Sequence, residues 1–162
     1  MQTFLPYPSF VESARVLDRA RLGKQRVETM QLLRANTVAG HGWRRHPAAR
    51  MWSGFLPALT AYGLAVTDEW IRQGHADTVR PQLLTFAPEV EGKPQEALEL
   101  PPWLGDEAFH LSHRSNLVRK SPEVYREVFG DVPDDLPYVW PVASLRAPTA
   151  GTEGAAPVHS GE

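Results

Sequence analysis

The chain contains 162 residues, of which 42% are hydrophobic and 22% charged, and its formal net charge is −2. This composition is typical of a folded protein that is long enough to bury a core. The chain has no cysteine, which excludes a disulfide framework, a thiolate nucleophile and a cysteine-based zinc site. The sequence contains neither a signal-peptide pattern nor a run of about 18 apolar residues, so we expect a cytoplasmic protein that does not enter a membrane.

The charges are unevenly distributed along the chain. Residues 1–50 carry nine Lys and Arg residues against three acids, whereas the rest of the chain carries eight basic and sixteen acidic residues. The small net charge therefore hides a polarised molecule. A basic N-terminal part of this kind indicates a polyanionic partner.

The chain is predicted to start with an extended segment followed by two helices. Met1–Pro8 is expected to be extended, because its prolines disfavour a helix in the residues before them. Ser9 and Glu12 form a capping box that starts a short helix running to about Asp18. A second helix is expected over Arg19–Val38.

The second helix has two distinct faces. Apolar residues at helical spacing predict the side that packs on the core: Leu22, Val27, Met30 and Leu33. Residues spaced i, i+3, i+4 and i+7 share another side: Arg21, Lys24, Gln25 and Glu28. The single carboxylate of this face is therefore expected among cationic and amide groups.

The most strongly periodic segment lies in the middle of the chain. Pro47 suits the first position of a helix, and a long helix is expected over Ala48–Gln73, closed by Gly74. Pro57 lies inside this segment and is expected to kink the helix. The aromatic and aliphatic stripe of Trp52–Trp70 is assigned to the core.

The rest of the chain is predicted to be an irregular connection followed by two helices. Residues 77–102 are rich in proline and acid, with a short strand or turn at Leu83–Phe86. Asp106 is the expected N-cap of a helix over Glu107–Lys120, and a further helix follows and ends at Gly130.

The C-terminal part is divided into a packed segment and a tail. Tyr138 and Trp140 are expected to pack back on the body of the protein. Residues 143–162 are small and polar, which predicts a disordered tail. We therefore predict a compact all-α fold with one domain over residues 1–142.

Nucleotide-binding and zinc-protease motifs are absent from the sequence, which has no GxxxxGK[ST], GxGxxG or HExxH. His110 and His113 lie one helical turn apart, but no third ligand completes a metal motif. Helix-surface positions or phosphate contacts are the alternatives for these two histidines and for His41 and His46. We expect neither a metal nor a cofactor.

Glu28 has two interpretations. The simpler one is an exposed i, i+4 ion pair with Lys24, worth about 0.3–0.5 kcal/mol. The functional one is a carboxylate in a positively charged groove, where it can stabilise a cationic transition state or move a proton. Excision of a base develops such charge at the sugar.

Two basic clusters also have two interpretations. The Trp43-Arg44-Arg45-His46 stretch places an aromatic ring beside three potential phosphate contacts, an arrangement that suits a bent or unstacked nucleic acid. His113-Arg114 and Arg119-Lys120 form a second basic island in the acidic C-terminal part. The alternative for both clusters is an ordinary solvated helix face.

Three segments carry a family resemblance through their order and spacing. The first is the N-terminal segment followed by the basic helix with its glutamate, Arg21–Glu28. The second is the His46–Gly74 segment, which begins with His-Pro and ends Glu-Trp-Ile-Arg-Gln-Gly, and the third is Ala108–Tyr125. With these segments, most of residues 1–141 resembles the pyrimidine-dimer DNA glycosylase family, the phage-type endonuclease V that excises ultraviolet photoproducts, and looks closest to a bacterial branch.

The resemblance implies a helical, metal-independent enzyme. In the family, the N-terminal α-amino group attacks C1′ of the damaged nucleotide and forms a Schiff base, and β-elimination then nicks the strand. α-Amino groups are partly unprotonated near neutral pH, which suits a nucleophile. Glu28 matches the family's essential glutamate, and Arg21 and Arg26 match arginines that grip kinked DNA, although Val27 stands where the family has an arginine beside its glutamate.

The start of the chain departs from the family pattern. The family enzyme exposes a small residue after methionine removal, whereas position 2 is Gln here. The size of Gln2 disfavours that removal, so the nucleophilic amine is expected to belong to Met1. Thr3 could provide the amine only after unusual processing.

The sequence thus predicts a DNA glycosylase with associated AP-lyase activity, with Met1 and Glu28 as catalytic residues. The expected partner is damaged or modified duplex DNA, bound by a monomer. Nucleic-acid contacts are predicted for a basic and aromatic set: Arg21, Lys24, Gln25, Arg26, Trp43, Arg44, Arg45, His46, His113, Arg114 and Lys120. Two alternatives are a non-catalytic nucleic-acid-binding module on the same scaffold and a glycosylase-like enzyme that acts on a free nucleoside or nucleotide.

Overall fold

The computed structural model describes residues 1–141, and every regular element within them is helical. The prediction of an all-α fold is confirmed. The predicted tail at residues 143–162 lies outside the described residues. The α-helices are, in chain order, α1 (Phe10–Val16), α2 (Arg19–Thr37), α3 (Pro47–Arg50), α4 (Leu56–Arg72), α5 (Arg80–Leu84), α6 (Glu107–Lys120) and α7 (Pro122–Phe129), with short 3-10 helices at Pro88–Val90 and Gln95–Ala97.

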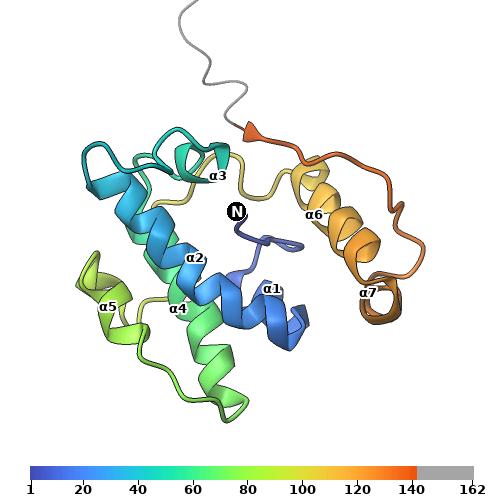
Figure 1. The fold of residues 1–162 in the computed structure, drawn as a ribbon, viewed down its shortest axis with the longest axis horizontal. Coiled ribbons are helices and arrows are strands. Elements are labelled where there is room, and N and C mark those ends of the chain that lie inside the picture. The colour runs from blue at the N-terminus through green and yellow to red at the C-terminus, as the bar shows by residue number, and fades with distance from the viewer. Residues whose placement is uncertain (142–162) are drawn as a thin grey trace, which may run out of the picture.

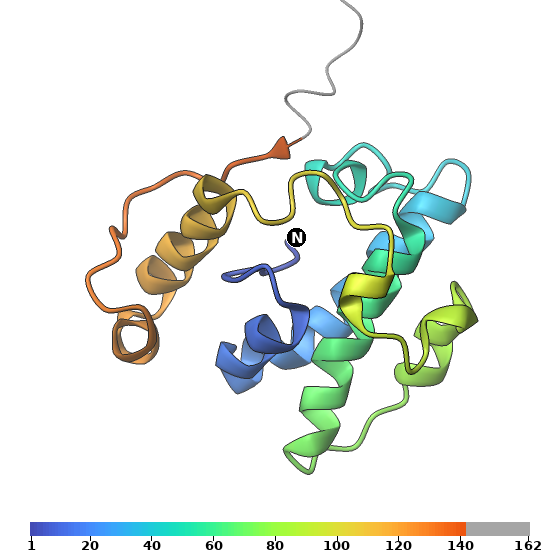
Figure 2. The same ribbon diagram turned by 180° about the vertical axis from the view of Figure 1, so that it is seen from behind.

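The helices form two groups with the N-terminus between them. Helices α2 and α4 pack along each other, α1 packs on α4, and α5 covers the other flank of α4, while α6 and α7 pair on the opposite side (Figure 1). The first residues of the chain lie in the middle of the molecule, between α2 and α6, in both views (Figure 2). Among residues 1–141, no helix is both long enough and apolar enough to cross a membrane.

Local capping explains where several helices begin and end. The Ser9 hydroxyl accepts a hydrogen bond from the Glu12 backbone N–H at 3.2 Å, and the Asp106 carboxylate accepts one from Ala108 N–H at 3.1 Å. Both caps satisfy N–H groups that have no partner inside the helix. Gly74 and Gly130 follow the ends of α4 and α7 with φ of +92° and +62°, a conformation that favours glycine. These four predicted helix ends are confirmed.

The predicted long helix over Ala48–Gln73 is wrong. The chain instead forms the single-turn α3, a series of turns over residues 51–54, and then α4. Gly54 adopts a φ of +84°, which interrupts a right-handed helix. Pro57 falls in the first turn of α4. A backbone N–H at this position would have no acceptor inside the helix, so a proline is accommodated there. The predicted kink at Pro57 is therefore also wrong.

The segment predicted as a short strand or turn at Leu83–Phe86 contains the last two residues of α5 and then a turn at Thr85 and Phe86, so the strand alternative is wrong. Asp77 explains the start of α5, because its carboxylate accepts hydrogen bonds from Val79 N–H at 3.1 Å and Arg80 N–H at 2.8 Å. Leu83 is fully buried and packs α5 on α4.

The core assignment of the central stripe is confirmed at its main positions, since Trp52, Leu59, Tyr62 and Val66 are fully or almost fully buried. Helices α2 and α4 approach closely at Gly63, where an added Cβ would lie 2.8 Å from the Thr29 side chain.

The apolar face predicted for α2 needs one correction. Leu22, Met30 and Leu33 are buried, but Val27 is 47% exposed. Five residues after Leu22, Val27 is rotated by about 140° around the helix axis. The buried positions between these apolar residues are taken by polar side chains, Gln25 and Thr29.

The segment after α7 returns along α6, as predicted for Tyr138 and Trp140. Backbone groups of this segment bond to α6, with Val139 N–H donating to the Ser112 hydroxyl at 3.1 Å. The Tyr138 ring lies 5.4 Å from His113, and the Trp140 ring lies 6.0 Å from His46. The return segment therefore connects α6 with the loop before α3.

Candidate active site

The first five residues of the chain are built into the protein interior. Met1 is partly buried, and Gln2, Thr3, Phe4 and Leu5 are buried. The Trp52 indole N–H donates to the Thr3 hydroxyl at 3.1 Å. An N-terminus held in this way has a defined position relative to the surrounding helices.

Two buried histidines of α6 hold Leu5 from both sides of its backbone. Leu5 N–H donates to His113 Nδ1 at 2.9 Å, and Leu5 C=O lies 2.8 Å from His110 Nδ1. His110 Nε2 accepts from Gly105 N–H at 2.9 Å, so its Nδ1 carries the proton and donates to Leu5. Both rings are therefore neutral. Burial lowers the pKa of His113 to about 3 and also lowers the pKa of His110.

This pair of neutral histidines predicts a loss of stability in mild acid. The ordinary pKa of His113 in the unfolded chain is about 6.5, far above its folded value of about 3, so the unfolded state takes up the proton first. The contribution of neutral His113 to the free energy of unfolding is fully present above about pH 6.5 and is lost as the pH decreases toward 3. We expect His113 alone to cost about 1 kcal/mol between about pH 7 and about pH 5.5, and urea titrations across that range measure it.

The matched variant for this prediction is His113→Asn, whose amide oxygen can accept the Leu5 hydrogen bond without titrating. Its stability is expected to change less than that of the wild type across the same pH range, which lies above the titration of most carboxylates. An equal dependence on pH in both proteins would contradict the role assigned to His113.

The buried position of His113 corrects its predicted role. Its side chain is fully buried in the core, so the expected contact with nucleic acid is inconsistent with the structure. Arg114 already has partners within the protein, because it donates to Pro6 C=O at 2.8 Å and forms an ion pair with Glu107. Both residues secure the N-terminal segment.

Gln25 joins the N-terminal segment to Glu28. Its Oε1 accepts from Phe4 N–H at 2.9 Å, and its Nε2 donates to Gln2 C=O at 2.8 Å and to Glu28 Oε2 at 2.9 Å. The Tyr62 hydroxyl donates to the same Oε1 at 2.6 Å and also lies 2.9 Å from Phe4 C=O. Gln25 is only 1% exposed, so its predicted contact with nucleic acid is also inconsistent with the structure.

Met1 and Glu28 line one pocket of about 400 Å³, together with cationic groups. Among residues 1–141, Glu28 is the only acid in the lining. Burial raises the pKa of Tyr138, another lining residue, to about 12, so its hydroxyl stays protonated at neutral pH. The residues of this amine–carboxylate pocket are Met1, Gln2, Phe4, Ala20, Arg21, Lys24, Gln25, Glu28, Lys120 and Tyr138.

The simple ion pair between Glu28 and Lys24 is not formed in the part of the chain that the structure describes, although both residues line the pocket. Arg21 is engaged with Asp18 at 3.0 Å. Lys24 and Lys120 have no such partner among residues 1–141. The Glu28 carboxylate therefore has Gln25 as its hydrogen-bond donor and unpaired cations nearby.

Arg26 lies on another side of α2. It pairs with Asp77, its guanidinium lies 4.4 Å from the centre of the Trp70 ring, and its side chain is only 13% exposed. The structure thus uses Arg26 to attach the start of α5 to α2 and α4. This arrangement is inconsistent with the predicted contact between Arg26 and nucleic acid.

The loop before α3 borders the N-terminus. His46 caps α3 by accepting from Ala48 N–H at 3.0 Å. Burial lowers the pKa of His46, and the positive charge at the N-terminus lowers it further. Trp43 packs against His46, with ring centres 5.3 Å apart, and remains 41% exposed. The exposed Trp43 therefore packs on a histidine that feels the positive charge of the N-terminus.

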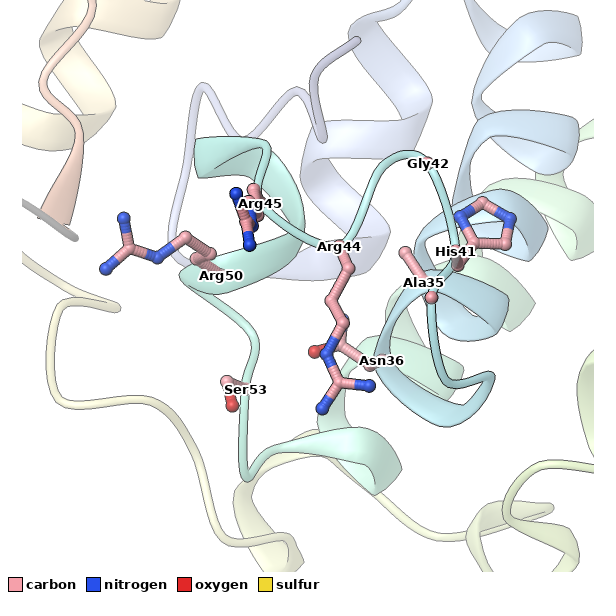
Figure 3. Close-up of a pocket in the computed structure, with 9 residues that line it drawn as sticks. Ala35, Asn36, His41, Gly42, Arg44, Arg45, Arg50 and Ser53 are labelled. Carbon is pink, nitrogen blue, oxygen red and sulfur yellow. The ribbon is translucent and has the colours of Figure 1, made fainter.

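A second and larger pocket of about 1000 Å³ lies beside this loop (Figure 3). Arg44 extends toward Asn36, while Arg45 lies in the loop just before α3 and Arg50 is the last residue of α3 (Figure 3). None of these arginines has an ion-pair partner among residues 1–141, and no acid lines the pocket. We call it the arginine pocket; its lining residues are Ala35, Asn36, Gly40, His41, Gly42, Arg44, Arg45, Arg50 and Ser53.

Several residues of these pockets are not among the sequence-based candidates. Arg50 follows Arg45 by five residues in the same basic stretch, so its charge was a usable signal. Tyr138 had no such signal, because it reaches the amine–carboxylate pocket through the return of the chain along α6. Tyr62 lines neither pocket, but it bonds to Gln25 from the core stripe. Within the described residues, no group of three or more His, Asp or Glu side chains is placed to hold a metal ion.

The fold and the two pockets define an all-α protein in which the chain start, one carboxylate and several unpaired cations share one region. The family model described as pyrimidine dimer DNA glycosylase matches residues 1–81, half of the chain, and the chain belongs to this family. No curated protein and no solved structure matches it. The matched residues include Met1, Glu28 and the arginine pocket, whereas Lys120 and Tyr138 lie beyond them.

Proposed function

We propose that this protein is a DNA glycosylase with associated AP-lyase activity, in which the Met1 α-amino group is the nucleophile and Glu28 the catalytic carboxylate. One observation carries the proposal: Met1 and Glu28 line the same pocket, among cations that suit a phosphate-rich substrate. The substrate is duplex DNA that contains a pyrimidine dimer or another altered base.

The proposed reaction begins at the sugar. The lone pair of the neutral amine attacks C1′, and the bond between C1′ and the base breaks with its electron pair leaving on the base. Loss of one proton from nitrogen and opening of the ring at O4′, which takes up a proton, give a protonated imine between the Met1 nitrogen and C1′. Removal of a 2′ proton then expels the 3′ phosphate with its electron pair. Glu28 stabilises the positive charge at the sugar and carries protons between these steps.

The DNA backbone is proposed to lie across both pockets. Arg21, Lys24 and Lys120 would contact phosphates at the reaction site, and Arg44, Arg45 and Arg50 would contact phosphates in the arginine pocket. The ring of Trp43, with His46 behind it, is positioned to stack on a base that has left the helix. An extended cationic surface beyond the amine–carboxylate pocket favours a polymeric substrate over a free nucleoside.

The arginine pocket gives a prediction for binding. Replacing Arg44 and Arg45 by Ala is expected to weaken duplex binding and to lower the slope of log K against log salt concentration by about 2, because each lost phosphate contact removes roughly one released counterion. Fluorescence anisotropy over a series of salt concentrations measures both effects.

A control variant for this prediction removes two positive charges elsewhere. Arg72 pairs with Glu69, and Lys93 is exposed; both lie outside the two pockets. Replacing Arg72 and Lys93 by Ala is expected to leave the salt slope nearly unchanged. Equal slopes for the wild type and the Arg44 and Arg45 variant would show that the arginine pocket does not bind DNA.

Borohydride trapping tests the proposed reaction. Hydride adds to the imine carbon and converts the Schiff base into a stable amine, so a covalent protein–DNA adduct is expected on ultraviolet-irradiated duplex and on abasic duplex. Binding of irradiated duplex without any adduct would instead support the non-catalytic module. Cleavage of a nucleoside without binding of duplex would support an enzyme that acts on small substrates.

A further inference from the structure

We propose that Gln25 is a positioning residue that sets the Met1 amine against the Glu28 carboxylate, a role that rests on the proposed function. The two reacting groups come from different parts of the chain. Met1 belongs to the threaded N-terminal segment, and Glu28 belongs to α2. Their relative placement therefore needs a side chain that contacts both.

Gln25 contacts both the N-terminal segment and Glu28, and every hydrogen-bonding position of its amide is used. One N–H of Nε2 donates to Gln2 C=O at 2.8 Å, and the other donates to Glu28 Oε2 at 2.9 Å. Oε1 accepts from Phe4 N–H at 2.9 Å and from the Tyr62 hydroxyl at 2.6 Å. An amide offers two donors and two lone pairs, so this arrangement leaves none of them free.

The neighbours of Gln25 also determine the orientation of the amide. A backbone N–H at Phe4 requires an acceptor, and a backbone C=O at Gln2 requires a donor, so a rotated amide would lose both bonds. Burial raises the pKa of Tyr62 well above its ordinary value, and the charge of Glu28 adds to this effect. Tyr62 therefore remains a donor and holds Oε1 in place.

No other side chain among residues 1–141 donates a hydrogen bond to Glu28. The charged groups that face it are Arg21 and Lys24 from α2, Lys120 from the end of α6 and the N-terminal amine, with the hydroxyls of Tyr62 and Tyr138 nearby. These cations attract the carboxylate without fixing its direction. The Gln25 bond fixes its direction and at the same time holds the backbone one residue after the nucleophile.

The simpler possibility is that Gln25 only stabilises the fold, and Gln95 provides a matched control for it. Gln95 Oε1 accepts from Phe10 N–H at 2.8 Å, and its Nε2 donates to Pro8 C=O at 2.9 Å. Gln95 thus joins the same N-terminal region to another part of the chain, but it does not contact Glu28. Gln25→Met and Gln95→Met remove equivalent backbone bonds from the two sites.

The experiment measures the rate of borohydride-trapped adduct formation at saturating irradiated duplex, together with the dissociation constant of the DNA. We expect Gln25→Met to slow adduct formation by about 30-fold or more while changing the dissociation constant by less than about 3-fold. Gln95→Met is expected to change both by less than about 3-fold. Tyr62→Phe removes the hydroxyl that bonds to Oε1 and to Phe4 C=O but leaves the Gln25 amide in place. It provides a milder variant with a loss in the same direction if Gln25→Met does not fold.

A double-mutant cycle separates positioning from general stabilisation. If Gln25 acts through Glu28, adding Gln25→Met to Glu28→Gln is expected to slow the residual reaction by less than about 3-fold. An equal loss in both backgrounds, or a loss no greater than that of Gln95→Met, would overturn the inference and leave the proposed function intact. Failure of the wild type to form any adduct would overturn both.

Discussion

Moving the N-terminal amine out of its pocket is expected to abolish adduct formation. Adding two residues before Met1 displaces the amine by up to about 7 Å, away from Glu28, which lines the same pocket as Met1. Because an effective nucleophile must lie within about 3–3.5 Å of the carbon it attacks, we expect the rate of borohydride-trapped adduct formation to fall by at least about 100-fold. Single-turnover trapping on irradiated duplex measures this loss.

The controls for this result are the two lysines of the same pocket. Lys24 and Lys120 also carry amines that can form Schiff bases, and both line the amine–carboxylate pocket. Lys24→Arg and Lys120→Arg keep the positive charges and are expected to retain the adduct. Loss of the adduct in either lysine variant, together with normal adduct formation in the extended protein, would show that a lysine and not Met1 is the nucleophile.

Glu28→Gln is expected to lower the rate of adduct formation by about 100-fold to 1000-fold, the size of effect seen when one group that stabilises a transition state is removed. The substitution keeps the shape of the side chain and can still bond to Gln25, so the N-terminal segment stays in place. Only the negative charge near the sugar is lost. Single-turnover trapping on irradiated duplex, compared with the wild type, measures the effect.

Binding distinguishes this effect from damage to the fold. The Glu28 carboxylate repels phosphate, so Glu28→Gln is expected to bind duplex as tightly as the wild type or more tightly. Glu12→Gln, on an exposed face of α1, removes one negative charge elsewhere and is expected to leave the rate unchanged. If Glu28→Gln formed the adduct at the wild-type rate, the Glu28 carboxylate would have no role in the mechanism.

The local features of the fold could be predicted from the sequence, because they depend on neighbouring residues. The caps at Ser9 and Asp106 and the glycines that end α4 and α7 are short-range signals of this kind. The periodic pattern did not reveal the break after α3, since the hydrophobic residues on both sides of it face the same core. Gly54 and Pro57, three residues apart, were the signal that a new helix begins there.

The candidate site was predictable only in part, because side-chain roles depend on distant contacts. The spacing of Arg21, Lys24, Gln25 and Glu28 on one face of α2 placed all four at the same pocket, as the structure has them. Their individual roles differ. Gln25 is buried and bonds to the backbone of Gln2, which lies 23 positions earlier in the chain.

His113 and Arg26 show the same limitation. Each carries a group that can bind phosphate, yet His113 holds Leu5 and Arg26 holds Asp77. No sequence spacing of about 108 or 51 residues indicates such a contact, because it depends on how the chain returns on itself. An arginine or histidine in a basic cluster is therefore a candidate for binding nucleic acid only until the structure shows whether it has a partner within the protein.

The central claim is that the chain's first amine is the nucleophile, and mass spectrometry of the trapped adduct tests it most directly. Tryptic cleavage after Arg15 releases the peptide Met1–Arg15, which contains no lysine, so a nucleotide remnant on this peptide marks the α-amino group. We predict the remnant on Met1, in a protein whose intact mass shows that methionine is retained. A remnant on the peptide that contains Lys24 or Lys120 would contradict the account.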